Sequence, residues 1–170
     1  MEKSGLIFKK FTELFILFKM NVRDAQISDV EAIHALISSY AEQDRMLFCS
    51  MADIYEKLQA FSVAEIDGAI VGCCALEIVW SNLAEIKSLA VDNTRKQKGI
   101  GRSLVNTAIE QAARLGVPKV FALTLEPDFF EKLGFEIVEK DTLPMKVWSD
   151  CAKCPKQQNC DEIAVVKKVS

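Results

Sequence analysis

At 170 residues, with 50% hydrophobic and 26% charged side chains, the chain has the size and composition of one globular domain with its own hydrophobic core. A formal net charge of −3 provides no general attraction to nucleic acid, so we expect no nucleic acid partner. No apolar run approaches the ~18 residues of a membrane-spanning helix, which argues against integral membrane insertion.

The first 19 residues are apolar at helical spacing. A helix here would place on one face Ile7, Phe8, Phe11, Leu14, Phe15 and Phe18. Such an amphipathic helix could pack on a partner or lie on a membrane surface. Alternatively, the domain itself begins at Met20. We therefore divide the chain into an N-terminal extension, 1–19, and a domain, 20–170.

From Met20 onward, strand patterns alternate with helical ones, which predicts an α/β (or α+β) domain. The expected strands are Met20–Arg23, Phe61–Ile66, Ala69–Val79, Glu85–Val91, Lys119–Leu125, Phe135–Glu139 and Glu162–Val169. The expected helices follow a Ser28/Glu31 capping box and a Ser50 cap, and cover Gly99–Leu115 and Pro127–Leu133. Asp67-Gly68 predicts a tight hairpin between the second and third strands.

The loop from Asp92 to Arg102 carries several basic residues and the glycines Gly99 and Gly101 directly before a helix. Glycines let a backbone approach a ligand closely, and the free N–H groups at a helix N-terminus favour an anion. The loop could therefore bind a pyrophosphate. Neither the P-loop pattern nor the Gly-x-Gly-x-x-Gly of dinucleotide sites is present, and a solvated basic loop is the alternative.

The spacing Lys96-x-x-Gly99-x-Gly101 resembles the Arg/Gln-x-x-Gly-x-Gly/Ala motif of the GNAT acetyltransferases, with Lys96 in place of the usual Arg or Gln. The resemblance implies a central, mixed, mostly antiparallel twisted sheet of about six to seven strands flanked by about four helices. It also implies acetyl-CoA as the acetyl donor. The expected cofactor contacts are Leu89, Ala90, Val91, Lys96, Gln97, Lys98, Gly99, Ile100, Gly101, Arg102, Ser103 and Phe130.

The segment from Phe129 to Phe135 is similar to the Phe-Tyr-Glu-Lys-Leu-Gly-Phe sequence of the same family. The family's tyrosine often protonates the departing thiolate, but Phe130 occupies its position and has no proton to transfer. The thiolate would then leave unprotonated or take its proton from water. In any other fold these phenylalanines would be ordinary core residues.

A closer resemblance covers most of the chain from Met20 to Val166. The residues around Trp80, the strand 83–91 and the tail 143–155 are similar to stand-alone bacterial amino-acid N-acetyltransferases of arginine biosynthesis. The resemblance implies a small-molecule amine acceptor, with L-glutamate as the leading candidate, and leaves a homodimer open. One position departs: Phe48-Cys49-Ser50 stands where that group tends to carry Pro-Arg before Ser or Pro.

We expect Glu85 to be the general base for the acceptor amine, directly or through water, because it begins the strand that leads to the cofactor loop. Lys87 shares its strand face and could bind an acceptor carboxylate. Ser88 and Trp80 complete the expected acceptor site. The alternatives are an exposed strand residue for Glu85 and a snorkelling surface lysine for Lys87.

Cys151-x-x-Cys154 followed by Cys160 raises the question of a zinc site, but a structural site needs four ligands and the single histidine, His34, is distant in sequence. We expect no metal. Six cysteines in a chain with no secretory features are expected to be free thiols in a cytoplasmic protein.

Two other functions remain open at this point. The enzyme could acetylate a protein amine or a polyamine instead of an amino acid. The domain could also be a non-catalytic module that binds acyl-CoA as a regulatory ligand, since the family's tyrosine is missing.

Overall fold

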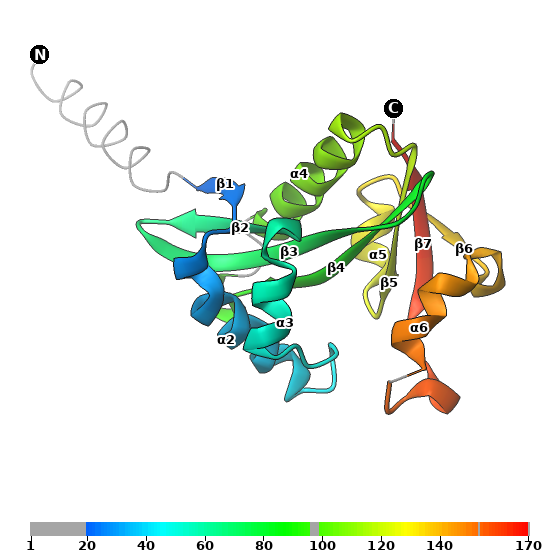
Figure 1. Ribbon diagram of the computed structural model, residues 1–170, viewed down its shortest axis with the longest axis horizontal. Coiled ribbons are helices and arrows are strands. Elements are labelled where there is room, and N and C mark those ends of the chain that lie inside the picture. The colour runs from blue at the N-terminus through cyan, green and yellow to red at the C-terminus, as the bar shows by residue number, and fades with distance from the viewer. Residues whose placement is uncertain (1–19, 96–98, 153, 170) are drawn as a thin grey trace, which may run out of the picture.

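A computed structural model of the chain describes residues 20–95, 99–152 and 154–169, so the expected helix within 1–19 and the contacts of Lys96, Gln97 and Lys98 lie outside the described residues. The strands form one seven-stranded sheet in the order β1-β2-β3-β4-β5-β7-β6 (Figure 1). They are β1 (Asn21–Asp24), β2 (Phe61–Ile66), β3 (Ala69–Trp80), β4 (Leu83–Val91), β5 (Lys119–Thr124), β6 (Glu136–Val138) and β7 (Ile163–Lys168).

Helices cover both faces of the sheet. They are α2 (Val30–Ala41), α3 (Met51–Glu56), α4 (Ile100–Arg114), α5 (Pro127–Glu131) and α6 (Trp148–Cys151), the last of which was not expected from the sequence. The mixed, mostly antiparallel sheet with helices on both faces confirms the predicted fold class. No helix in the described ranges is long and apolar enough to cross a membrane.

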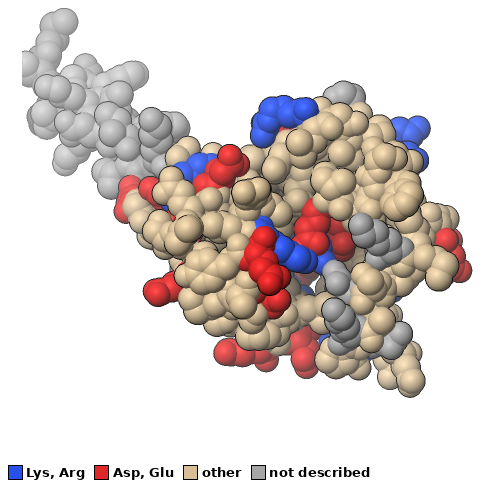
Figure 2. Space-filling model, viewed as in Figure 1, with Lys and Arg blue, Asp and Glu red and all other residues tan. Residues whose placement is uncertain are grey.

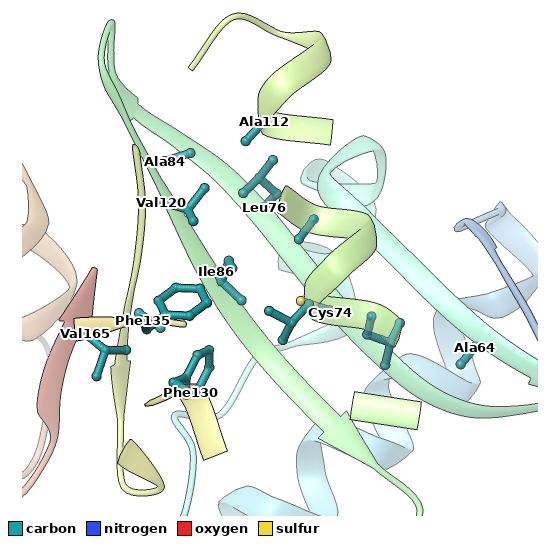
Figure 3. Close-up of a cluster of buried hydrophobic side chains, with 14 of the residues drawn as sticks. Ala64, Cys74, Leu76, Ala84, Ile86, Ala112, Val120, Phe130, Phe135 and Val165 are labelled. Atoms are coloured by element: carbon teal, nitrogen blue, oxygen red, sulfur yellow. The ribbon is translucent and has the colours of Figure 1, made fainter. Parts of the chain in front are cut away.

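The largest core cluster lies between the sheet and α4. Leu104 of α4 belongs to this cluster. Ala112 of α4 packs against Leu76 and Val120 of the sheet, and Phe130 and Phe135 extend the cluster around α5 (Figure 3). On the opposite face, Ile33 and Ile37 of α2 and Ile54 of α3 pack against β2 and β3. The tail containing α6 covers the β5–β7 part of that face through Leu143 and Val147, which contact Phe121. The strands β2, β3, β4, β5 and β7 therefore bury side chains on both faces, whereas the outer strands β1 and β6 have no buried residue.

Two local predictions, one of a hairpin turn and one of a helix cap, are confirmed. The β2–β3 hairpin turns at Asp67 and Gly68, with φ of 52° and 78°, so both adopt the left-handed conformation of a type I′ turn. Ser50 caps α3: its Oγ accepts the Asp53 N–H at 3.2 Å, and Asp53 Oδ2 accepts the Ser50 N–H at 3.0 Å.

The prediction of a Ser28/Glu31 capping box was wrong. A 3-10 turn over Ile27–Asp29 precedes α2, which moves the capping position to Gln26 and Asp29. Asp29 Oδ2 accepts the Gln26 N–H at 2.8 Å, and the Arg23 guanidinium donates to both Asp29 oxygens at 2.6 and 3.0 Å. Asp29 thus satisfies the start of α2 and joins it to β1.

The Arg23–Asp29 pair predicts a measurable pH dependence of stability. The hydrogen bond from Arg23 holds the pKa of Asp29 below its ordinary value of 3.8. The stabilisation is therefore complete above that ordinary pKa and is lost as the pH falls through the lower, folded pKa. In urea titrations at pH 7 and pH 3, Asp29→Asn should show a smaller drop in unfolding free energy on acidification than the wild type. An equal drop in both proteins would contradict this; Asp24→Asn, at the exposed end of β1, is the control.

Candidate active site

A cleft opens where β4 and β5 separate. These neighbours run parallel, and their register pairs Ala84 with Val120 and Glu85 with Phe121, with no paired residue after these among the described positions. Beyond this point the two strands diverge, and a cleft of about 1050 Å³ lies between them and the covering loops. Ligand pockets usually measure about 300–1,000 Å³, so the cleft is large enough for an extended cofactor arm together with a small acceptor.

A bulge in β4 lies along this cleft. Cys73 pairs with Ala90 and Ala75 with Lys87, so β4 has one more residue than β3 in this interval, and Ser88 adopts a φ of 50°. The extra residue reverses the alternation of side chains. Before the bulge the even-numbered Ile86 packs on the α4 face. After the bulge the odd-numbered Leu89 and Val91 pack on that face. The sequence analysis predicted a strand here but not the bulge within it.

The N-terminus of α4 borders the other end of the cleft. Gly99 caps the helix with a φ of 78°, and a Cβ placed on it would meet no atom within 4 Å. The first helical bond runs from the Ser103 N–H to the Gly99 carbonyl at 3.0 Å, so the N–H groups of Ile100, Gly101 and Arg102 have no intrahelical acceptor. At Gly101 a Cβ would lie 3.3 Å from Phe129, so the chain packs tightly there. These features fit a pyrophosphate held by backbone N–H groups.

Most of the expected cofactor contacts that the structure describes line this cleft. Those that do are Leu89, Val91, Gly99, Ile100, Gly101, Arg102 and Phe130. Two do not. The Ala90 side chain is fully buried against the α2 cluster, because the bulge turns it to that face, and Ser103 lies one turn into α4.

Phe130 contributes to both the core and the cleft wall. Its ring is 4% exposed and makes edge-to-face contacts with Phe129 and Phe135, with centroids 5.2 and 5.1 Å apart. The position of the family's tyrosine is thus an apolar wall. The cleft does contain another tyrosine, Tyr40, whose hydroxyl donates to the Val91 carbonyl at 2.9 Å and accepts the Val91 N–H at 3.3 Å.

Glu85 and Lys87 line the cleft where β4 and β5 part. Lys87 Nζ lies 3.9 Å from Glu85 Oε2 and 3.7 Å from Oε2 of Glu77, which is opposite Glu85 on β3. Lys57 of the α3 region donates to Glu77 at 2.9 Å and ends the network. The side chain of Glu85 is only 12% exposed. In the view of Figure 2, acidic and basic side chains lie side by side near the middle of the molecule.

Of the two other expected acceptor residues, Ser88 lines the cleft and Trp80 does not. Trp80 pairs with Leu83 at the turn between β3 and β4, before the strands diverge, and its side chain is 60% exposed. Trp80 therefore lies at a strand turn outside this cleft, and its expected contact with the acceptor is not brought together with Glu85, Lys87 and Ser88.

The C-terminal tail forms a wall that sequence reasoning missed. The tail residues that line the cleft are Lys140, Asp141, Val147, Trp148, Cys151, Cys154, Cys160 and Glu162. Burial raises the pKa values of the Cys151 thiol and the Glu162 carboxyl above their ordinary values. Across the described ranges, no group of three or more His, Cys, Asp or Glu residues has the geometry of a metal site. The unusual tail sequence was the available signal for this wall.

The loop after α2 closes the cleft from the remaining side. Arg45 stacks over Tyr40, with Cζ 5.4 Å from the ring centroid, and pairs with Glu126 of the β5–α5 loop at 2.5 Å. Lys156 of the tail donates to the Asp44 carbonyl at 3.1 Å. The same short loop therefore contacts both opposing walls.

Comparison with known proteins agrees with this geometry. Residues 27–135 match the acetyltransferase (GNAT) family. An "uncharacterized N-acetyltransferase" of Chlorobaculum tepidum is 44% identical over 146 residues, 86% of this chain and 94% of the relative. An "amino-acid acetyltransferase" of Mycobacterium tuberculosis is 37% identical over 135 residues, 78% of this chain and 77% of the relative.

Solved structures give the same result. N-acetylglutamate synthase from Neisseria gonorrhoeae, complexed with coenzyme A and N-acetyl-glutamate, has a TM-score of 0.81 at 27% identity, covering 89% of this chain and 35% of the synthase. A Mycobacterium tuberculosis protein in complex with CoA and NLQ has a TM-score of 0.78 at 31% identity, covering 88% and 99%. With the family match spanning more than half of its length, the chain belongs to the acetyltransferase (GNAT) family and is an acetyl-CoA-dependent N-acetyltransferase.

Proposed function

We propose that the enzyme transfers the acetyl group of acetyl-CoA to the α-amino group of a small amino acid, with L-glutamate as the leading acceptor, as a step of arginine biosynthesis in the cytoplasm. The relative named amino-acid acetyltransferase and the synthase structure with bound N-acetyl-glutamate support this acceptor class.

The observation that carries the proposal is the Glu85–Lys87 pair at the point where β4 and β5 part. An amino acid presents an amine and a carboxylate on one carbon. A carboxylate and an ammonium side by side on one strand face can contact both groups at once. An acceptor with a lone amine would offer Lys87 no carboxylate to bind.

In the proposed reaction the neutral amine attacks the thioester carbon, a C–N bond forms and the C–S bond breaks. Glu85, directly or through water, accepts the proton that the amine loses. The thiolate leaves unprotonated or takes a proton from water, because Phe130 has none to give. Positioning of the amine beside the thioester supplies much of the rate acceleration.

The absence of the related group's arginine supports Lys87 as the residue that binds the acceptor carboxylate. Cys49 occupies that position, and the charges of Lys57, Glu77 and Lys87 all act on its thiol. Cys49 therefore borders the same charged network but cannot bind a carboxylate as arginine does. We assign carboxylate binding there to Lys87.

Lys87→Met should raise the KM for glutamate by about 10–100-fold with a smaller change in kcat, because it removes a charge-assisted hydrogen bond worth about 1.5–3 kcal/mol. The matched control is Lys57→Met, which removes the other cation paired with Glu77 without altering the cleft lining. Steady-state kinetics with glutamate as the varied substrate measures both. An unaltered KM in Lys87→Met would remove the proposed anchor.

The acceptor class is tested by incubating the enzyme with acetyl-CoA and a panel of glutamate, glutamine, other amino acids, a lysine-containing peptide and a polyamine. Thiol release and product mass identify the acetylated compound. We expect N-acetylglutamate as the preferred product. Preferred acetylation of the peptide or polyamine would replace the amino acid with that acceptor.

A further inference from the structure

Lys140 places an ammonium group in the cleft with an unusual partner. It begins a short 3-10 turn, Lys140–Thr142, between β6 and α6, and it lines the cleft. Its Nζ donates to Cys160 Sγ at 3.1 Å. Within the described ranges no carboxylate lies within the 4.0 Å of an ion pair with it.

Apart from Arg102, which lies at the expected pyrophosphate end of the cleft, the other described cations around this cleft are paired with carboxylates. Lys87 lies between two carboxylates, Arg45 pairs with Glu126, and Lys156 lies 3.9 Å from Asp161. A thiol is a weak acceptor compared with a carboxylate. A half-buried ammonium whose hydrogen-bond partner is a thiol therefore retains most of its capacity to bind an anion from the cleft.

Lys140 and Lys87 lie near the same carboxyl group. Both line the cleft together with Glu162, the residue directly before β7; burial raises the pKa of the Glu162 carboxyl, and the charges of Lys140 and Lys87 lower it. This end of the cleft thus combines two ammonium groups, Lys87 and Lys140, with the carboxyl groups of Glu85 and Glu162. The two carboxylates of a dicarboxylic amino acid match the two ammonium groups, and its single ammonium group matches the carboxylate of Glu85.

We propose that Lys140 binds the side-chain carboxylate of the acceptor, so that the site selects a dicarboxylic amino acid over its neutral amide. The inference rests on the proposed amino-acid acetyltransferase function and adds the residue that determines specificity. In this arrangement the α-carboxylate contacts Lys87, the amine faces Glu85, and the side-chain carboxylate replaces the Cys160 thiol as the partner of Lys140.

The test compares glutamate with glutamine as acceptors for the wild type, Lys140→Met and Lys140→Arg. Lys140→Met should lower kcat/KM for glutamate by about 10–100-fold, mainly through KM, and change the value for glutamine by less than about threefold. Lys140→Arg keeps the charge and should retain the preference for glutamate. Lys119→Met, at an exposed lysine that begins β5 outside the cleft lining, is the control and should leave both acceptors unaffected.

The outcomes separate a failure of the role of Lys140 from a failure of the proposed function. Equal losses with glutamate and glutamine in a folded Lys140→Met enzyme would assign Lys140 a structural role and overturn the inference while leaving the amino-acid acetyltransferase in place. A wild-type enzyme that acetylates glutamine as well as glutamate would also overturn it. If the wild type acetylates neither, the proposed function and the inference both fail. Thermal unfolding of each variant confirms that the compared proteins are folded.

Discussion

Glu85→Gln is expected to lower kcat by about 10²–10⁴-fold, the range typical of a general base. Glutamine keeps the size of the side chain and its hydrogen-bonding capacity but cannot accept the proton of the attacking amine. The acidic limb of the kcat–pH profile should flatten, because the group that must be ionised is gone. Acceptor KM should change little, since Lys87 remains in place.

The matched control for this experiment is Glu77→Gln. Glu77 is the cross-strand neighbour of Glu85 and also pairs with Lys87, but it does not line the cleft. The Glu77→Gln enzyme should therefore keep most of the wild-type kcat. A Glu85→Gln enzyme with wild-type kcat and an unchanged pH profile would reject Glu85 as the base, and equal losses in both variants would assign the effect to the ion-pair network.

The second large effect is expected at Gly99. Replacing it with leucine should weaken acetyl-CoA binding by about 10–100-fold, because the side chain would fill the space in front of the α4 N-terminus and prevent close approach of the pyrophosphate. Isothermal titration calorimetry of the folded variant measures this directly.

Gly116 provides a control of the same backbone conformation. It follows α4 with a φ of 74°, against 78° at Gly99, and a Cβ on either glycine meets nothing within 4 Å. Leucine should therefore cost similar stability through backbone strain at both positions. If Gly99→Leu and Gly116→Leu bind acetyl-CoA equally well, the N-terminus of α4 is not the pyrophosphate site.

Local patterns predicted most of the fold because their causes are local. Asp67-Gly68 specifies its turn through two left-handed residues, and Gly99 directly before a helical pattern marked the start of α4. The Ser28/Glu31 capping box failed because a competing local cap was available: Asp29 also binds Arg23 from β1, a contact made only when strand and helix have come together.

The candidate site was predictable along β4 and α4 and not elsewhere. Glu85 and Lys87 are two residues apart, so strand alternation was enough to place them together. Lys140 and Glu162 are far from them in sequence, and only the sheet order, with β7 between β5 and β6, brings the tail across the cleft. The bulge at Ser88 depends on pairing between β3 and β4, which sequence alternation alone does not contain.

The most direct test of this account is a crystal structure of the enzyme with coenzyme A and N-acetylglutamate. We expect the pyrophosphate on the backbone N–H groups at Gly99–Arg102, the amide nitrogen of the product beside Glu85, and its α-carboxylate on Lys87. A product bound elsewhere, with Glu85 and Lys87 contacting only each other and Glu77, would contradict the account.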